Sequence, residues 1–374
     1  MSRQSFTQSV VAEIETAKLA IYYQNYLDVR DRVLSMLDEK FEQHTIPSNY
    51  WEEELAGFDY MFDASPWIIR KLREHCYHLT GLKAYEYRRH HAHKKEPFQR
   101  KLEALRRLDP KGLFVPESRE LGGFGHEIDG ELVNLDTLKF YESLIALEMA
   151  GALENMRKFS GRSLVVEIGG GWGGFAYQFK KNFPECTYVI IDLPQTLLFS
   201  GVYLKTLFPN SRVLMYGGKE GRSFASEDFK EFDFILLPHY FINKQQFSAI
   251  DLAINMVSFQ EMTSDQVLNY VRWLWTTGCR SVYSHNRSRS VHNNQLSDVG
   301  SILERGFRMS EISVLPVPYT VLETSGPVHW SSEPRKMAKQ VIQSILAPAR
   351  NVEISPLNYQ HLFGYLHRQF KEHN

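Results

Sequence analysis

The spacing of apolar residues changes from helical to strand-like along the chain. Between residues 10 and 41 the apolar positions recur every three or four residues, as on one face of a helix. A second helix is predicted from Pro66, because Ser65 before it is a good N-cap and Gly81 is a good stop. The first part of the chain is therefore predicted to be mainly helical.

After residue 161, short apolar runs alternate with helical patterns, which is typical of a parallel α/β sheet covered by helices. We predict strands at 163–168, 187–193, 212–216, 232–238, 251–259, 280–284 and a final pair across 312–323. The last part of the chain, about 40 residues, has helical spacing and predicts two more helices. We expect two domains, a helical one at 1–160, acting as substrate cap or in oligomerisation, and an α/β one at 161–374.

Composition and charge remove several classes of function. A chain of 374 residues with 43% hydrophobic content can bury two cores. The net charge of −1 provides no field that would attract nucleic acid or an anionic membrane. The three widely spaced cysteines fit neither a disulfide framework nor a zinc site. No signal-peptide core and no apolar stretch of about 20 residues is present, so we predict a cytoplasmic protein without a membrane span.

A glycine-rich turn follows the first predicted strand of the sheet. Gly169, Gly171 and Gly174 have the dinucleotide-binding spacing, and the turn begins a helix where open α/β sheets bind ligands. The glycines let the backbone approach a ligand, and the free N–H groups of the helix start attract its anionic part. Taken alone, the glycines fit S-adenosylmethionine (SAM) and a nicotinamide dinucleotide equally well.

Two acids near the turn bear on this choice. Glu167 stands two residues before the first glycine, where a carboxylate can pair with the ammonium group of SAM. A nicotinamide dinucleotide has no such cation. Asp192 ends the second strand about 20 residues further on, where it can accept the ribose hydroxyls of either cofactor or simply cap a strand. Glu167 therefore favours SAM, whereas Asp192 supports any nucleoside.

With these residues in place, the sequence resembles the class I SAM-dependent methyltransferases and, more narrowly, bacterial sugar O-methyltransferases. The similar segments are 65–75, 128–138, 191–194 and 255–262. The resemblance implies a Rossmann-like domain at 161–374, with a mostly parallel seven-stranded sheet between helices. It also implies SAM as the cofactor and a place in polysaccharide biosynthesis. The fifth strand departs from the family at His285, so the resemblance gives that residue no role.

The predicted cofactor contacts gather at the carboxyl ends of the strands. Tyr216 is the weakest of them, because it either flanks the adenine or merely begins a loop. The full set is Glu167, Gly169, Gly170, Gly171, Trp172, Asp192, Leu193, Tyr216, Asn255 and Ser258.

Methyl transfer to a weakly acidic hydroxyl needs a group that removes its proton. Glu261 is our first prediction for this base. By analogy, it stands where small-molecule O-methyltransferases with a similar turn carry a catalytic histidine. Alternatively, Glu261 only caps the next helix. His239 and His285, at the ends of other strands, are competing bases or hydrogen-bonded structural residues.

The acceptor is predicted to be a sugar hydroxyl in a small molecule or a glycan, on the resemblance alone. Asn286 and Arg287 can recognise hydroxyls or a phosphate through directed hydrogen bonds. Asp129 and Asn134 lie in the polar segment between the domains, which can close over a substrate as a lid. No metal-ligand spacing stands out, so no metal is predicted.

Two other functions stay open. An NAD-dependent oxidoreductase acting on a sugar nucleotide also satisfies the glycine pattern, although no Tyr-x-x-x-Lys pair follows the middle strands. A non-catalytic scaffold could keep the same fold and use the helical region for docking. The N-terminal helices could also mediate a homodimer.

Overall fold

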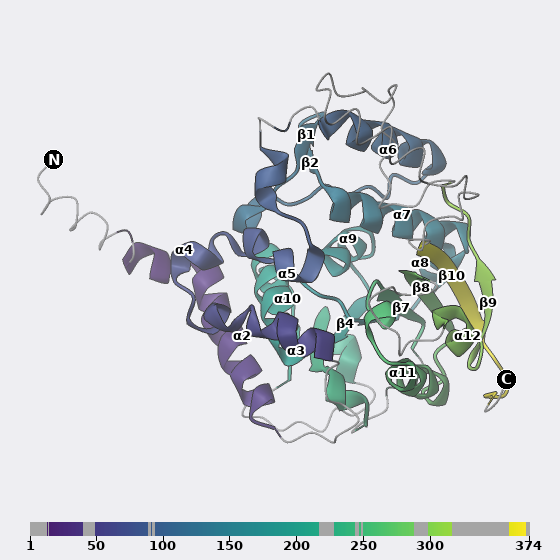
Figure 1. Ribbon diagram of the computed structural model, residues 1–374. Helices are drawn as coiled ribbons and strands as arrows, with labels where there is room; N and C mark the ends of the chain where they lie inside the picture. Colours follow the sequence, from purple (N-terminus) through teal and green to yellow (C-terminus); the bar gives the residue numbers. More distant parts are fainter. Residues whose placement is uncertain are drawn as a thin grey trace, which may run out of the picture.

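The computed structural model describes residues 13, 15–39, 49–88, 91, 94–216, 228–243, 247, 250–287, 298–315 and 359–371. Before the large sheet the chain forms helices, short 3₁₀ helices labelled η, and one small hairpin (Figure 1). These elements are α2 (Ile21–Leu37), α3 (Asn49–Ala56), η2 (Asp59–Asp63), α4 (Pro66–Ile69), η3 (Leu72–His75), α5 (Tyr77–Thr80), η4 (Ala84–Tyr87), α6 (Lys95–Leu108), η6 (Glu120–Gly122), β1 (His126–Ile128), β2 (Glu131–Val133), α7 (Leu135–Met149) and α8 (Ala152–Lys158).

The helix predicted between Pro66 and Gly81 is broken into three pieces, α4, η3 and α5. The backbone of Lys71, between α4 and η3, leaves the helical region with φ −117° and ψ 26°. Gly81 ends α5 in the left-handed conformation, with φ 69°, as its stop signal predicts.

The second part of the chain alternates strands and helices. Its elements are β3 (Leu164–Ile168), α9 (Gly174–Asn182), β4 (Thr187–Asp192), α10 (Pro194–Leu207), β5 (Val213–Met215), η7 (Asp228–Glu231), β6 (Phe234–Pro238), η8 (His239–Asn243), β7 (Leu252–Met256), η9 (Phe259–Glu261), α11 (Ser264–Thr276), β8 (Ser281–Arg287), α12 (Val299–Leu303), β9 (Phe307–Glu311) and β10 (Tyr359–Leu366). The strands form one sheet in the order β5-β6-β4-β3-β7-β8-β10-β9.

The predicted α/β class, a mostly parallel sheet with helices after a helical N-terminal part, is confirmed. The strands β5, β6, β4, β3, β7 and β8 are parallel to their neighbours in the sheet. Strand β10 runs antiparallel between β8 and β9. The sheet has eight strands rather than seven. Seven is the number that the resemblance implies, whereas the predicted apolar runs, with the final pair, already number eight. The run at 232–238 becomes β6 and pairs between β4 and β5.

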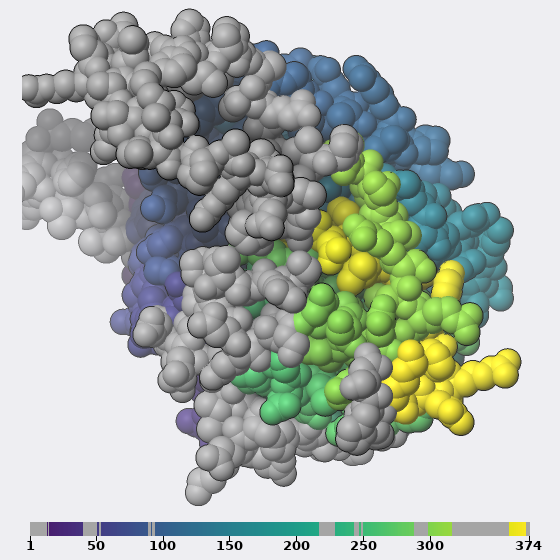
Figure 2. Space-filling model, turned by 45° about the vertical axis from the view of Figure 1, so that its right-hand side comes forward, coloured from purple at the N-terminus to yellow at the C-terminus, as the bar shows by residue number. Residues whose placement is uncertain are grey.

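The C-terminal end of the sheet differs from the prediction. Strand β9 lies at Phe307–Glu311, ahead of the pair predicted across 312–323, of which 316–323 lie outside the described residues. Residues 359–366 were predicted to be helical and instead form β10. In Figure 2 the yellow C-terminal residues lie against the light-green ones of the region that includes β9. Pairing with β8 and β9 on both sides outweighs the local helical spacing.

The core lies on both faces of the sheet. Along β3, Val165 packs in the cluster that includes α2, α7 and α10, whereas Leu164 and Val166 pack in the cluster with α11 and α12. Alternation of this kind follows from the two-residue repeat of a strand with both faces covered. Helix α2 lies along α10 (Figure 1), so the N-terminal helices share their core with the sheet. None of the described helices is long and apolar enough to cross a bilayer.

Candidate active site

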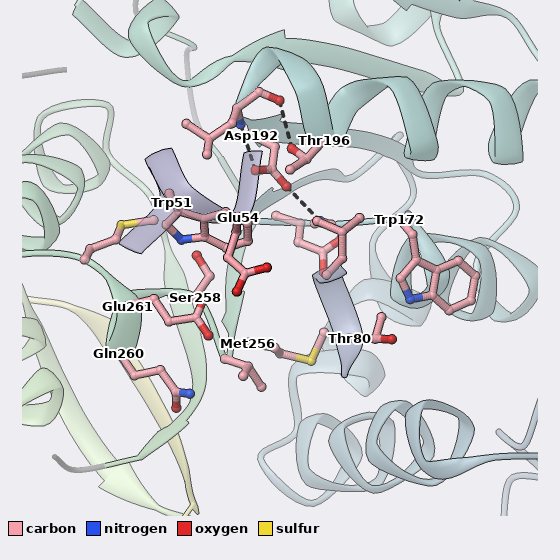
Figure 3. A pocket seen from close by; sticks show the side chains of 18 of the residues that line it. Trp51, Glu54, Thr80, Trp172, Asp192, Thr196, Met256, Ser258, Gln260 and Glu261 are labelled. Carbon is pink, nitrogen blue, oxygen red and sulfur yellow. Dashed lines mark hydrogen bonds between the residues drawn. The ribbon is translucent and has the colours of Figure 1, made fainter. Parts of the chain in front are cut away.

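A cavity of about 590 Å³ lies at the carboxyl ends of β3, β4, β6 and β7, within the usual size range of small-molecule sites. The sheet side contributes the glycine-rich turn, Asp192, and residues 256–258 and 260–262. The opposite side comes from the N-terminal part, with Trp51, Glu54 and residues 77–82. Figure 3 shows side chains from both parts around one space. The cavity therefore joins segments that lie far apart in the sequence.

The turn after β3 has a backbone that glycine adopts readily. Gly169, Gly171 and Gly173 have φ angles of 74°, 54° and 84°, in the left-handed region. A Cβ at Gly169 would overlap the hydroxyl of Ser258, and one at Gly170 would lie 2.8 Å from Ile190. The turn is thus packed tightly on its sheet side. At Gly171, which lines the cavity, a Cβ would meet nothing within 4 Å.

Asp192 joins the end of β4 to this turn. Its carboxylate accepts the N–H groups of Gly171 and Leu193, both at 2.7 Å. Burial raises the pKa of Asp192 to about 6, against the lowering effect of these hydrogen bonds and of Thr196. Asp192 and Leu193 both line the cavity, as predicted for cofactor contacts.

Glu167 is almost fully buried, with 2% of its surface exposed. The hydroxyl of Tyr188 donates to it at 3.0 Å. Burial raises its pKa to about 8, with a further increase from nearby Asp192, although Tyr188 and Lys139 act in the opposite direction. Within the described residues, neither Glu167 nor Asp192 forms an ion pair. The cavity therefore contains two acids that have no cationic side chain at ion-pair distance among the described residues.

Glu261 lies in η9, just beyond β7, and lines the same cavity. The chain reaches it through Val257, whose φ of 62° is strained for a β-branched residue. Burial raises the pKa of Glu261 to about 8, although Arg287 and Lys139 lower it. The N-cap of α11 is Thr263, in a capping box with Gln266, so the helix does not rely on Glu261 for its cap.

The two competing bases lie in different surroundings. His239 lines the cavity beyond β6. His285 is fully buried and does not line it, and its Nδ1 lies 3.0 Å from the hydroxyl of Ser143. Burial, followed by the neighbouring His361, lowers the pKa of His285 well below its usual value. Of the two, only His239 lies where an acceptor in the cavity could reach it.

Three predicted contacts are structural ties outside the cavity lining. Asn255 donates to the Ile168 carbonyl at 2.8 Å, and Asn286 donates to the Asn255 side chain at 2.8 Å. These bonds hold the ends of β3, β7 and β8 together. The hydroxyl of Tyr216 donates to Glu39 at 3.1 Å. The other predicted cofactor contacts, including Trp172 and Ser258, and the predicted acceptor contact Arg287, line the cavity.

The predicted lid residues are not brought to the cavity. Asp129, in the turn of the β1–β2 hairpin, pairs with Arg106 at 3.1 Å. Asn134 is buried and caps α7 by accepting the N–H of Thr137 at 2.9 Å. Turn and capping geometry account for both residues.

Sequence reasoning missed a buried ionic group beside the glycine turn, here called the Arg73 cluster (Arg73, Glu117, Asp136 and Lys139). The guanidinium of Arg73 binds Glu117 at 2.9 Å and Asp136 at 2.8 Å, and it lies 3.9 Å from the ring centre of Trp172. Asp136 and Lys139 line the cavity. A signal was present in the sequence, since 135–149 is largely apolar and yet carries charged residues that the structure buries.

The aromatic wall was also missed. Trp51 and Tyr77 line the cavity from the N-terminal part, and the ring of Tyr77 lies 4.0 Å from that of His78. His78 in turn pairs with Glu54 at 3.2 Å. No local motif marks these residues, because tertiary packing alone brings them to the sheet edge.

One group in the described part of the chain has metal-ligand spacing, namely Glu142, His285 and His361. Its geometry fits a hydrogen-bonded cluster better than a metal site. The two imidazole rings stack 3.9 Å apart at 27°, whereas a shared metal would have to lie near the plane of both rings. Lys101 already lies 3.6 Å from Glu142, and His361 lies 3.0 Å from it. The hydroxyl of Tyr283 is hydrogen-bonded to the other nitrogen of His361 at 2.7 Å.

A family model described as an O-methyltransferase domain matches residues 104–219, which include the glycine turn, Glu167 and Asp192. The match supports a methyltransferase with SAM as its cofactor. No curated protein sequence gives a match.

Solved structures of methyltransferases are similar at low identity. Magnesium protoporphyrin IX methyltransferase from Synechocystis PCC 6803 with bound S-adenosylhomocysteine (SAH) is 8% identical, with 73% of this chain and 96% of that chain covered and a TM-score of 0.35. Phospholethanolamine N-methyltransferase 2 of Haemonchus contortus is 10% identical, with 62% and 57% covered and a TM-score of 0.32. The match covers 27% of another solved chain, a pericyclic reaction enzyme, at 16% identity and a TM-score of 0.24.

Proposed function

We propose that this methyltransferase moves the methyl group of SAM to a hydroxyl of a sugar or sugar-containing acceptor, by in-line displacement with Glu261 as the general base. The observation that carries the proposal is the position of Glu261. Its carboxyl group has a pKa of about 8 and lines the same cavity as Glu167, Asp192 and the glycine turn. A base with a pKa near the working pH is the most effective proton acceptor.

The residues present fit SAM. Glu167 would hold the ammonium group, Asp192 would accept the ribose hydroxyls, and the N–H groups of the turn would bind the carboxylate. Glu167 and Asp192 form no ion pair among the described residues. A cationic ligand would therefore be electrostatically more favourable beside them than an anionic dinucleotide. When bound, SAM supplies a methyl group on a positively charged sulfur, which becomes a neutral thioether after transfer.

Glu261 handles the proton. As the acceptor oxygen bonds to the methyl carbon, Glu261 would accept the hydroxyl proton and become a neutral carboxylic acid. Burial favours this neutral form, which is why its pKa is raised. His239, which also lines the cavity, is the second candidate for the base.

The acceptor side of the cavity supports a ligand rich in hydroxyl groups. Gln260, Gln266 and Asn269 bring amide groups, which both donate and accept hydrogen bonds. Trp51 and Tyr77 add aromatic rings that can pack against the apolar face of a sugar. These side chains agree with the resemblance to sugar O-methyltransferases.

The same proposal includes the organisation of the chain. Residues 1–160 would form a helical domain whose 51–82 part covers the acceptor, and 161–374 would form the methyltransferase domain. Cytoplasmic location, homodimerisation through the N-terminal helices and a place in polysaccharide biosynthesis are proposed from the sequence alone.

Glu261→Gln tests the base. The substitution should lower kcat about 100- to 10,000-fold on any methylated acceptor, because the amide cannot accept the proton. Release of SAH from SAM with a panel of sugars and sugar nucleotides measures this loss, and calorimetry should show unchanged SAH affinity. The kcat/KM of the native protein should rise with pH up to about 8, as Glu261 becomes a carboxylate.

The matched control is Glu304→Gln, which changes an exposed acid far from the chemistry and should leave turnover intact. Native-like turnover by Glu261→Gln would show that another group, such as His239, takes the proton.

A further inference from the structure

Two side chains with a permanent positive charge line the cavity, and they differ in their partners. Lys139 pairs with Asp136 at 3.1 Å. Arg287, at the end of β8, forms no ion pair within the described ranges of the chain. Arg287 is therefore the cationic side chain in the cavity with which an anionic ligand could form an ion pair.

Contacts within the protein hold Arg287 in place without a ligand. Its backbone N–H donates to the side chain of Gln260 at 2.9 Å, and its guanidinium lies over the ring of Tyr359, 5.1 Å from the ring centre. Its Nε atom is buried, and no hydrogen-bond acceptor for it is found in the described structure. Leaving a buried donor of a charged group without an acceptor is costly, which argues for a ligand that supplies one.

Arg287 also lies close to the proposed base. Among the charged groups that lower the pKa of Glu261, it has the largest effect. The backbone of Arg287 bonds to Gln260, the residue before Glu261, and Arg287 and Glu261 line the same cavity, so a ligand group bound by Arg287 would lie beside Glu261. Arginine is suited to this role because its planar fork binds carboxylates and phosphates through two parallel hydrogen bonds.

We propose that the acceptor carries an acidic group, a carboxylate or a phosphate ester, which binds the guanidinium of Arg287 and brings a neighbouring hydroxyl to Glu261. This inference rests on the proposed function and narrows its substrate class from sugars in general to acidic sugars or sugar phosphates.

Binding of such an acceptor would also prepare the base. An anion on Arg287 removes the positive charge that lowers the pKa of Glu261, so the Glu261 carboxylate becomes a stronger proton acceptor and its ionisation shifts to higher pH once the acceptor is in place. A neutral sugar would leave Arg287 without its partner. The acidic group should therefore affect kcat as well as KM.

Matched pairs of acceptors test this inference with the full-length protein. The carboxylate arm compares glucuronic acid with glucose and galacturonic acid with galactose. The phosphate arm compares glucose 1-phosphate with methyl glucoside, and the two arms distinguish the two sources of the acidic group. The variants are Arg287→Met and Arg287→Lys, with Arg280→Met as control. Arg280 immediately precedes the same strand, is exposed, and pairs with Asp251 outside the cavity lining.

The native protein should prefer the acidic member of at least one pair. Arg287→Met should lower kcat/KM for that acceptor about 10- to 100-fold, the usual effect of losing hydrogen bonds to a charged group, and should change the neutral member little. Arg287→Lys should restore part of the loss, because it keeps the charge without the fork. Arg280→Met should behave as the native protein does, and SAH affinity should stay the same in all variants.

Equal methylation of both members of every pair by the native protein, or an unchanged preference in Arg287→Met, would overturn this inference and leave the proposed function standing. If SAH binds but neither member of any pair is methylated, the proposed function fails for these acceptors and the inference fails with it.

Discussion

Glu117 and Asp136 of the Arg73 cluster and Glu167 beside the glycine turn are all buried acids, yet their partners differ. Glu117 and Asp136 are 6% and 3% exposed, and Glu167 is 2% exposed, so burial is similar. Arg73 lies within 2.9 Å of both Glu117 and Asp136, whereas Glu167 accepts a hydrogen bond from the hydroxyl of Tyr188 and forms no ion pair with the described residues. Asp136 lines the cavity and still has a cation beside it, so a position in the cavity does not by itself leave an acid without an ion pair. The contrast therefore concerns Glu167, whose carboxyl group we propose binds a ligand.

The largest expected effect on stability comes from removing the ion pairs of Arg73. Arg73→Met should lower the free energy of unfolding by about 3 to 5 kcal/mol, because it leaves Glu117 buried without its cation. Urea denaturation measures the loss. Arg157→Met, which removes an exposed partner of Glu148, should cost less than about 1 kcal/mol. Equal losses in the two variants would mean that the Arg73 cluster is not the structural element described here.

An intermediate effect is expected at the turn that the cluster supports. Gly169→Ala should cost about 2 to 4 kcal/mol and abolish SAH binding, because the new Cβ would overlap Ser258 in a left-handed backbone. Gly278 has a similar φ of 67° but open space around its Cβ position. Gly278→Ala should therefore show the backbone strain alone, about 1 to 2 kcal/mol. Identical denaturation curves for the two variants would rule out close packing at Gly169.

The smallest effect concerns the cavity acid itself. The pKa of Glu167 is raised from its ordinary 4.5 to about 8, so the folded protein holds a proton that the unfolded chain releases between these values. Native stability should consequently fall as pH rises through this window. Glu167→Gln cannot ionise and should be more stable than the native protein above pH 8, by about 1 to 2 kcal/mol.

Urea denaturation at pH 6 and at pH 8.5 measures this difference, with Glu304→Gln as an exposed control whose pH dependence should match the native protein. If Glu167→Gln keeps the native pH dependence, then Glu167 is not a cavity acid without a balancing charge.

The parts of the fold that the sequence could predict are those with strong local signals. Strands β3 and β4 begin within one residue of the predicted positions, because each is a short apolar run bounded by polar residues. Strand β10 could not be predicted in this way. Its residues become extended by pairing with β8 and β9, which lie about 50 to 80 residues earlier in the chain.

The candidate site divides in the same manner. The cofactor half follows one contiguous motif, so Glu167, the glycines and Asp192 could be placed from spacing alone. The N-terminal wall at Trp51 and Tyr77, and the contact of Arg73 with Trp172, depend on long-range packing. Asn255 and Asn286 were predicted as ligand contacts because they lie at strand ends, but there they bind one another.

The central claim is that the cavity binds SAM, and calorimetric titration with SAM, SAH and NAD⁺ under identical conditions tests it most directly. Our account predicts that SAM and SAH bind, that Asp192→Ala weakens both about 10- to 100-fold, and that NAD⁺ gives no heat of binding. Binding of NAD⁺ without binding of SAH would contradict it.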